Sequence, residues 1–212
     1  MSSTIKVNNI QNLAGDDSGI DLSTNDQIIL KTANTTAITV NSSQVANFAN
    51  NPTVNSVPYT NAPAFLAKMS GDQSVTDENL TKVQFDTEVY DTDGKYDHST
   101  NYRFTPTVAG TYFLHAQVNA ESNANTQLAD FFLILAKNNA DLYVRRINFN
   151  ASYVNRASLN LQVTDVANTT DYYEIFVYVN DTSGNPTLGA LEPLGSGNGV
   201  ASFFGAYKMI GI

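Results

Sequence analysis

Hydrophobic and polar residues alternate with a period of two in many short segments of this chain. In residues 110–119 one row of side chains is apolar and the other is mixed: Tyr112, Leu114, Ala116 and Val118 against Phe113, His115, Gln117 and Asn119. Successive side chains of a β-strand point to opposite faces, so the segment is predicted to be a strand with one buried face. No segment has the periodicity of an amphipathic helix. The pattern therefore predicts an all-β protein.

The density of this pattern divides the chain into three parts. Residues 1–50 contain sparse apolar pairs separated by turn-forming residues: Ile5 and Val7, Ile20 and Leu22, Ile28 and Leu30, Ile38 and Val40. Residues 51–62 hold Pro52 and Pro58 among Asn and Ser, which is typical of a linker. Residues 63–212 contain closely spaced short strands and are predicted to form one antiparallel sandwich of the Greek-key or jelly-roll type.

The first fifty residues are not expected to fold as a single copy. Their few apolar side chains cannot offset an ordering entropy of ~1–2 kcal/mol per residue. The regular spacing of the apolar pairs favours an extended β-rich stem, intertwined with other copies or docked on a partner. The alternative is a disordered tail.

Two strands of the larger part are apolar on both faces. Residues 128–136 are predicted to be buried between the sheets or against a neighbouring subunit. Residues 172–179 combine an aliphatic row with an aromatic row, and one sandwich would leave the second row in water. We therefore expect several copies to bury these rows against one another. The predicted interface comprises Phe113, Phe131, Tyr172, Phe176, Tyr178, Phe203 and Tyr207.

Composition and charge exclude several classes of function. The 212 residues carry a net charge of -9 with only 11 Lys and Arg, so nucleic acid is not an expected partner. The absence of cysteine excludes disulfides, thiolate metal sites and a cysteine nucleophile. No secretion signal and no apolar run long enough for a membrane helix is present, so we expect synthesis in the cytoplasm without a signal peptide, and no membrane insertion.

A series of short motifs in residues 63–212 carries a family resemblance. They are Pro63-Ala64-Phe65, Thr81-Lys82-Val83-Gln84-Phe85-Asp86, Tyr96-Asp97, Ser99-Thr100, Arg103-Phe104-Thr105-Pro106, Val108-Ala109-Gly110-x-Tyr112 and Phe203-x-Gly205. In this order they resemble the globular head of complement C1q and the tumour-necrosis-factor-like jelly rolls. The resemblance implies a ten-stranded jelly roll, a tight homotrimer with aromatic residues near its axis, and non-catalytic ligand binding through loops. Residues 1–50 resemble short fibres of bacterial viruses.

Candidate chemistry is sparse. The two histidines, His98 and His115, have no sequence relation to a Ser/Asp constellation, so we expect no enzyme. Asp91, Asp93 and Asp97 resemble the start of a calcium loop, but the rest of that pattern is absent, and turn capping is the alternative. No other cofactor is expected.

Surface residues supply the remaining binding candidates. The adjacent pair Arg145 and Arg146 can contact an acidic sugar or a carboxylate of a neighbouring subunit. Tyrosines such as Tyr90, Tyr143 and Tyr153 can stack on sugar rings, or they can belong to the core or an interface. The predicted ligand-binding residues are Tyr90, Asp91, Asp93, Tyr153, Arg145 and Arg146.

These observations favour a trimeric structural protein on the surface of a bacterial virus particle. Residues 1–50 would attach to other virion proteins, and the head in residues 63–212 would bind a host-surface polysaccharide or protein. Weak sites would gain affinity through multivalency. The alternatives are a capsid decoration protein or head fibre with a mainly structural role, and a secreted lectin-like binder.

Overall fold

The computed structural model describes residues 61–124, 127–149, 154–194 and 197–210, together with short strands between residues 9 and 58. The chain forms two compact units, Met1–Thr60 and Asn61–Ile212. Among the residues that the structure describes, no helix is long and apolar enough to cross a membrane.

The first unit is built from short antiparallel strands. Its sheet runs in chain order through β1 (Asn9–Gln11), β2 (Gly19–Asp21), β3 (Ile28–Thr32), β4 (Thr35–Val40) and β5 (Ala46–Phe48). A hairpin of β6 (Thr53–Val54) and β7 (Val57–Pro58) falls in the predicted linker. The predicted pair Ile5 and Val7 lies outside the described residues. No side chain that the structure describes in this unit is buried, and Phe48 is 51% exposed.

The second unit, the head, is an antiparallel sandwich of two sheets. The β14 sheet has the order β11 (Thr87–Asp91), β8 (Ala64–Lys68), β22 (Phe203–Lys208), β14 (Gly110–Glu121), β19 (Thr187–Gly189) and β9 (Gln73–Ser74), and β17 (Arg156–Ala167) pairs with the other edge of β14. The β18 sheet has the order β12 (Tyr96–Asp97), β13 (Arg103–Phe104), β18 (Tyr173–Asp181), β15 (Leu128–Lys137) and β16 (Ala140–Asn148), with β10 (Thr81–Lys82) also paired to β18.

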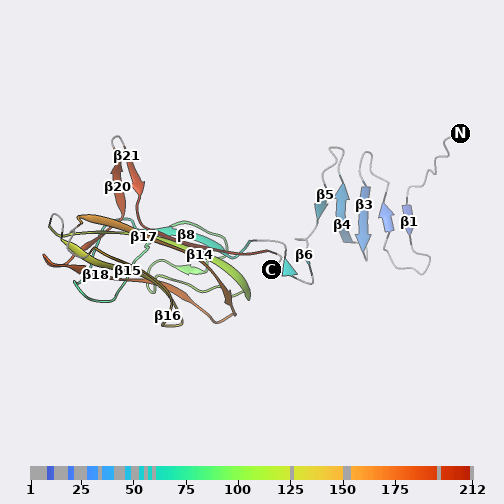
Figure 1. Ribbon diagram of the computed structural model, residues 1–212. Helices are drawn as coiled ribbons and strands as arrows, with labels where there is room; N and C mark the ends of the chain where they lie inside the picture. Colours follow the sequence, from blue (N-terminus) through green and yellow to red (C-terminus); the bar gives the residue numbers. More distant parts are fainter. Residues whose placement is uncertain are drawn as a thin grey trace. The chain divides into compact units, whose positions relative to one another are not determined.

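The connections confirm the predicted jelly roll. The chain crosses between the sheets after β9, β10, β11, β13, β14, β16, β17 and β18, so each sheet is assembled from strands that are distant in sequence. Figure 1 shows the sheets as two layers, one containing β8, β14 and β17 and the other β15, β16 and β18. The strands beyond the ten expected, β9, β10 and β19, are short. A hairpin of β20 (Leu191–Leu194) and β21 (Gly197–Val200) projects from the sandwich.

Aromatic rings from both sheets form the centre of the core. Phe65 of β8 stacks on Tyr96 of β12 with ring centroids 4.5 Å apart, and it lies 4.7 Å from Phe104 of β13 and 5.0 Å from Phe204 of β22. The Tyr96 hydroxyl donates a hydrogen bond to the Phe85 carbonyl oxygen (3.1 Å). These rings join the sheets because each strand directs alternate side chains inward.

The structure corrects the prediction that Phe131 belongs to an intersubunit interface. Its side chain is 0% exposed and is part of the core cluster. Phe132, the next residue of β15, takes the outward position instead, because adjacent residues of a strand face opposite sides.

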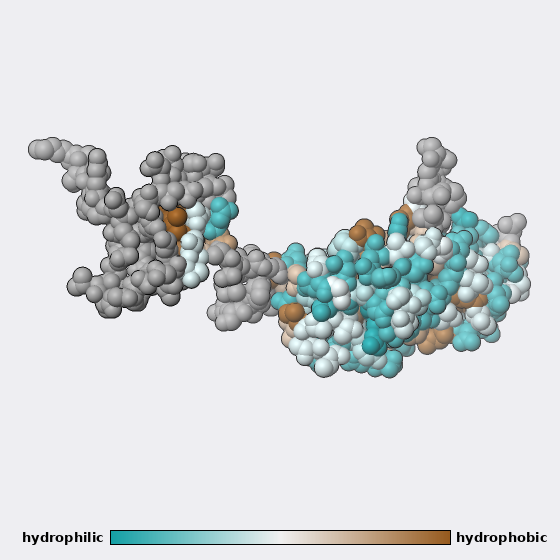
Figure 2. Space-filling model, turned by 180° about the vertical axis from the view of Figure 1, so that it is seen from behind, coloured by the Kyte–Doolittle hydropathy of each residue, from teal (hydrophilic) through white to brown (hydrophobic). Residues whose placement is uncertain are grey.

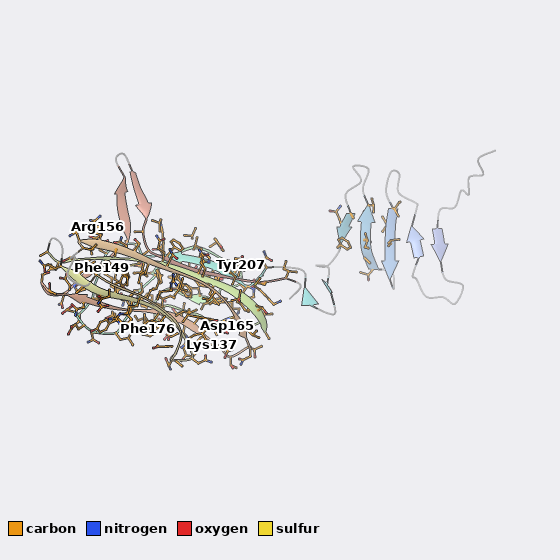
Figure 3. The ribbon with its side chains drawn as sticks, viewed as in Figure 1. Lys137, Phe149, Arg156, Asp165, Phe176 and Tyr207 are labelled. Carbon is orange, nitrogen blue, oxygen red and sulfur yellow. The ribbon has the colours of Figure 1, made fainter. Side chains whose placement is uncertain are left out.

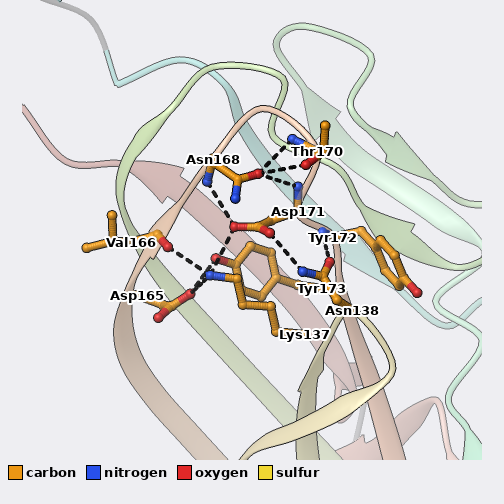
Figure 4. Close-up of polar contacts among 9 residues, drawn as sticks. All are labelled: Lys137, Asn138, Asp165, Val166, Asn168, Thr170, Asp171, Tyr172 and Tyr173. Carbon is orange, nitrogen blue, oxygen red and sulfur yellow. Dashed lines mark hydrogen bonds and ion pairs between the residues drawn. The ribbon is translucent and has the colours of Figure 1, made fainter.

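A polar network closes one end of the sandwich (Figure 4). Lys137 at the end of β15 places its Nζ 2.8 Å from Asp165 Oδ2 of β17 and 3.0 Å from Asp171 Oδ2. The Tyr173 hydroxyl donates to the same Asp165 oxygen (2.6 Å), and Asn138 Nδ2 donates to Asp171 Oδ1 (2.8 Å). Because β15 and β17 belong to different sheets, the network ties the two layers together.

The ionisation of the network follows from these contacts. Burial opposes the charge of Lys137, but hydrogen bonds to Asp165 and Asp171 outweigh it and raise the lysine pKa. Burial also opposes the charge of Asp171, yet hydrogen bonds from the Asn168 backbone, the Asn138 amide and Lys137 lower the pKa of its carboxyl from 3.8 to about 2. Lys137 and the Asp171 carboxyl are therefore both ionised near neutral pH.

Lys137→Met is expected to lower the free energy of unfolding of the head by ~1–3 kcal/mol, because two partly buried carboxylates lose their cation. Urea unfolding at pH 7 measures the loss, and Lys95→Met is the control, since Lys95 makes no ion pair with the described residues. A carboxyl with a lowered folded-state pKa contributes stability above its unfolded pKa and loses it as pH falls. The gap between the variant and the wild type should therefore shrink as pH falls from 3.8 toward about 2. If the difference in unfolding free energy between Lys137→Met and the wild type were the same at pH 7 as at about pH 2, the role of Asp171 would be refuted.

Candidate functional site

The outward face of the β14 sheet carries a continuous row of rings, here called the aromatic strip and made of Phe113, His115, Phe203 and Tyr207. Phe113 and Tyr207 are directly paired across β14 and β22, with ring centroids 5.3 Å apart. His115 lies 5.8 Å from Phe113 and 5.9 Å from Phe203, centroid to centroid. The alternation that buries Tyr112 in the core forces Phe113 outward.

A glycine opposite His115 makes room for the imidazole. Gly205 is its cross-strand partner, and a Cβ atom at Gly205 would lie 2.7 Å from His115 Cε1 and 3.0 Å from the Phe65 carbonyl oxygen. Any side chain there would push the imidazole out of the strip. His115 Nδ1 is buried and has no hydrogen-bond partner among the described residues. Phe203, Gly205 and Tyr207 thus form one outward row of β22 that frames the histidine.

Uncharged side chains extend the strip across β17. The outward positions of β14 and β17 pair as Thr111 with Val166, Phe113 with Thr164, His115 with Gln162, Gln117 with Asn160, and Asn119 with Ser158. The charged pair Glu121 and Arg156 (3.1 Å) lies only at the end of these strands. Lys68, the cross-strand partner of Phe203, is a further charge at the border of this face. Aromatic rings among uncharged side chains, with charge only at the borders, have the composition of the buried centre of a protein interface.

The other predicted interface residues lie on the opposite side of the head. Phe176 and Tyr178 lie on β18, and Tyr172 directly precedes this strand. Figure 3 shows Phe176 and Tyr207 in different layers. The predicted interface residues therefore lie on two opposite faces of the head, and a contact of Tyr172, Phe176 and Tyr178 with another copy stays a prediction.

Cations of the same chain cover this second row of rings. The guanidinium carbon of Arg103 lies 4.6 Å from the Tyr172 ring centroid, and Lys82 Nζ lies 5.5 Å from that of Phe176. Cation–π contacts of this kind keep charge, and therefore water, at the outer surface of the β18 sheet.

An exposed edge adjoins the aromatic strip. Tyr143 and Ile147 of β16 are 40% and 38% exposed, although their cross-strand partners Leu135 and Phe131 are buried. Their side chains therefore lie on the core side of an edge strand that no further described strand covers. A groove between β16 and β17 is lined by residues that include Tyr143 and Gln162, and Gln162 is the cross-strand partner of His115.

The predicted calcium loop is a set of capped turns. Asp91 accepts hydrogen bonds from the backbone nitrogens of Asp93 (3.2 Å) and Tyr96 (2.7 Å), and Gly94 takes the left-handed conformation with φ 62°. The Thr100 backbone N–H, 2.9 Å from Asp97 Oδ1, is the largest of several hydrogen bonds that lower the pKa of the Asp97 carboxyl. No cluster of three or more metal-binding side chains occurs among the residues that the structure describes. The geometry is that of turn capping.

The predicted ligand-binding residues do not form one site. Tyr90 is exposed and pairs with Leu66 on the outward face of the β14 sheet, whereas Arg145 and Arg146 lie on β16. Arg146 binds Asp130 of its own chain through Nε (2.9 Å) and Nη2 (3.0 Å). The carboxylate that it contacts in the structure thus belongs to the same chain, where a carboxylate of a neighbouring subunit was one expectation. Tyr153 lies outside the described residues.

Lower pH is expected to weaken the structure around His115. Burial lowers the pKa of this histidine below 6.5, so the folded chain binds fewer protons than the unfolded chain as pH falls through that range. Stability present above pH 6.5 is therefore lost toward more acidic pH, and His115→Gln should remove this decline. Thermal unfolding between pH 8 and 5 measures it, with His98→Gln as the control, since His98 faces Glu88 (2.7 Å) on the surface. An identical decline in His115→Gln would contradict the assignment.

Comparisons with known proteins find similarity to solved structures only. No protein-family model matches the sequence, and no curated protein matches it. Among solved structures, the globular domain of zebrafish complement 1qA protein is 13% identical, with a TM-score of 0.47 over 69% of this chain and 97% of that one. Eiger TNF from S. frugiperda is 13% identical, with a TM-score of 0.46 over 69% and 90%. Murine APRIL is 11% identical, with a TM-score of 0.47 over 69% and 98%.

Proposed function

We propose that the protein is the subunit of a homotrimeric, non-catalytic binding protein in which the aromatic strip of each head packs against a neighbouring copy. The observation that carries this proposal is the row of Phe113, His115, Phe203 and Tyr207 on a sheet face whose charged side chains lie only at its borders. Aromatic side chains and depleted charge distinguish the buried centre of interfaces from ordinary surface.

The edge beside the strip favours a ring over a two-fold dimer. A two-fold contact would pair the strip with itself and leave Tyr143 and Ile147 in water. If the strip of one head packs against the β16 edge of the next, both apolar surfaces are covered and the contact repeats around an axis. The two surfaces adjoin at β17, which suits a small ring, and three copies match the number implied by the sequence resemblance of residues 63–212.

The finer part of the proposal places this trimer on the surface of a bacterial virus particle. Residues 1–60 would attach to other virion proteins, consistent with short strands whose described side chains are all at least partly exposed. The heads would bind a polymer or protein of the host surface, and several weak sites on one particle would act together.

Electron microscopy with a gold-labelled antibody against residues 61–212 tests the virion part. The expected result is labelling of intact particles at regularly placed projections. Labelling spread over the capsid would favour a decoration protein, and unlabelled particles would overturn the assignment to a virion.

A further inference from the structure

The outer face of the β18 sheet has a groove that the proposed trimer leaves open. Its lining, here called the outer groove, consists of Phe132, Ile134, Asp141, Val144, Arg146 and Tyr178, with Asp130 at one rim. We propose that the outer groove binds an uncharged pyranose unit of a surface polysaccharide. This inference rests on the proposed function, in which the aromatic strip faces other subunits and the β18 sheet faces outward.

Rings and aliphatic side chains form the floor of the outer groove. Phe132 and Tyr178 are cross-strand neighbours with ring centroids 5.3 Å apart and planes at 83°. Ile134 and Val144 pair across β15 and β16 and continue the apolar surface. A pyranose has one face of C–H groups that packs on such rings, and ring side chains contribute contact area at little entropic cost.

Fixed polar groups lie at the walls. The Arg146 guanidinium carbon lies 4.7 Å from the Phe132 ring centroid, and its Nε and Nη2 are held by Asp130. Asn148 Nδ2 donates to the same carboxylate (2.8 Å). A planar array that is already ordered loses little freedom when a ligand arrives, which favours binding.

Asp141 supplies the group that remains available to a ligand. Its carboxylate makes no ion pair or hydrogen bond with other described residues, so its oxygens can accept hydrogen bonds from two neighbouring sugar hydroxyls. The Tyr178 hydroxyl likewise makes no hydrogen bond with another described residue. Apolar rings with a few convergent polar groups are the usual composition of a small-ligand site.

The charges favour a neutral ligand. One cation, Arg146, faces two carboxylates, Asp130 and Asp141, and the chain carries a net charge of -9, so an acidic sugar would be repelled. A cationic ligand would find the Phe132 ring already occupied, because the guanidinium of Arg146 lies over it. An uncharged polyol meets neither obstacle.

Saturation-transfer NMR on the full chain tests the site. The probes are oligosaccharides of glucose, galactose, mannose and N-acetylglucosamine, with oligogalacturonate as the anionic probe and choline as the cationic one. We expect transfer to at least one neutral probe, a loss of affinity of ~10-fold in Tyr178→Ala, and a smaller loss in Asp141→Asn. Tyr172→Ala, on the same face but outside the outer groove, is the matched control and should bind as the wild type does.

The outcomes separate this inference from the proposed function. No binding of any neutral probe, unchanged affinity in Tyr178→Ala, or preference for oligogalacturonate or choline would overturn the sugar site. The mass of each variant in solution is measured alongside. A trimer that binds no neutral sugar refutes the outer groove alone, whereas a single chain that binds sugar refutes the trimer alone.

Discussion

Phe113→Asp is expected to convert the assembled protein to single chains. The substitution places a carboxylate in a row of rings that faces another copy, and burial of an unpaired charge typically costs ~3–5 kcal/mol. Association should therefore weaken by ~100-fold or more, measured by sedimentation equilibrium of wild type and variant at the same concentrations.

Tyr172→Asp is the matched control for this experiment. Tyr172 is partly exposed like Phe113, but it lies beside the start of β18. The guanidinium of Arg103 lies over its ring and can form an ion pair with a carboxylate at this position. We expect this variant to keep the mass of the wild type. Circular dichroism of both variants shows whether the head remains folded. Dissociation by Tyr172→Asp and not by Phe113→Asp would mean that the wrong sheet was chosen as the interface.

Phe204→Ala is expected to lower the free energy of unfolding of the head by ~3–5 kcal/mol, because it opens a cavity between the sheets. The Phe204 ring is 0% exposed and lies 5.0 Å from Phe65 and 6.0 Å from Phe85, centroid to centroid. Denaturant unfolding at fixed protein concentration measures the loss.

Phe176→Ala provides the comparison within the same residue type. This ring is partly exposed on the outer face and contacts Lys82, so its removal leaves no cavity, and we expect ~1 kcal/mol or less. Equal losses in the two variants would contradict the placement of the core between Phe65, Phe85 and Phe204.

The sequence was most informative where only one face of a strand is apolar. In β14 the alternation alone assigned Tyr112, Leu114 and Val118 to the core, and all three are buried. In β15 it could not assign the faces, because Phe131 and Phe132 are equally apolar neighbours. Pairing with β18, which is distant in sequence, decides which of the two points inward.

The same reasoning explains what was missed at the candidate site. The sequence placed His115 in the mixed row of its strand and not in the predicted interface, whereas the structure places it between the rings of Phe113 and Phe203. The available signal was the alternation of Phe203, Gly205 and Tyr207, which gives β22 an outward aromatic row with a gap. Its alignment with His115 depends on long-range register, which periodicity does not supply.

Partners of the charged groups also come from distant strands. Arg146 follows Asp130 by 16 residues, and the two meet only because β15 and β16 pair with that register. The network of Lys137, Asp165 and Asp171 likewise requires β15 and β17 to belong to facing sheets. Spacing along the chain therefore identified Arg146 as a group that binds a carboxylate, but it could not show that the carboxylate is Asp130 of the same chain.

The mass of the full chain in solution tests the central claim most directly. Sedimentation equilibrium or native mass spectrometry at micromolar concentration should give three times the chain mass of 23.0 kDa. A stable particle with the mass of one chain would contradict the account, because the aromatic strip would then face water with nothing to cover it.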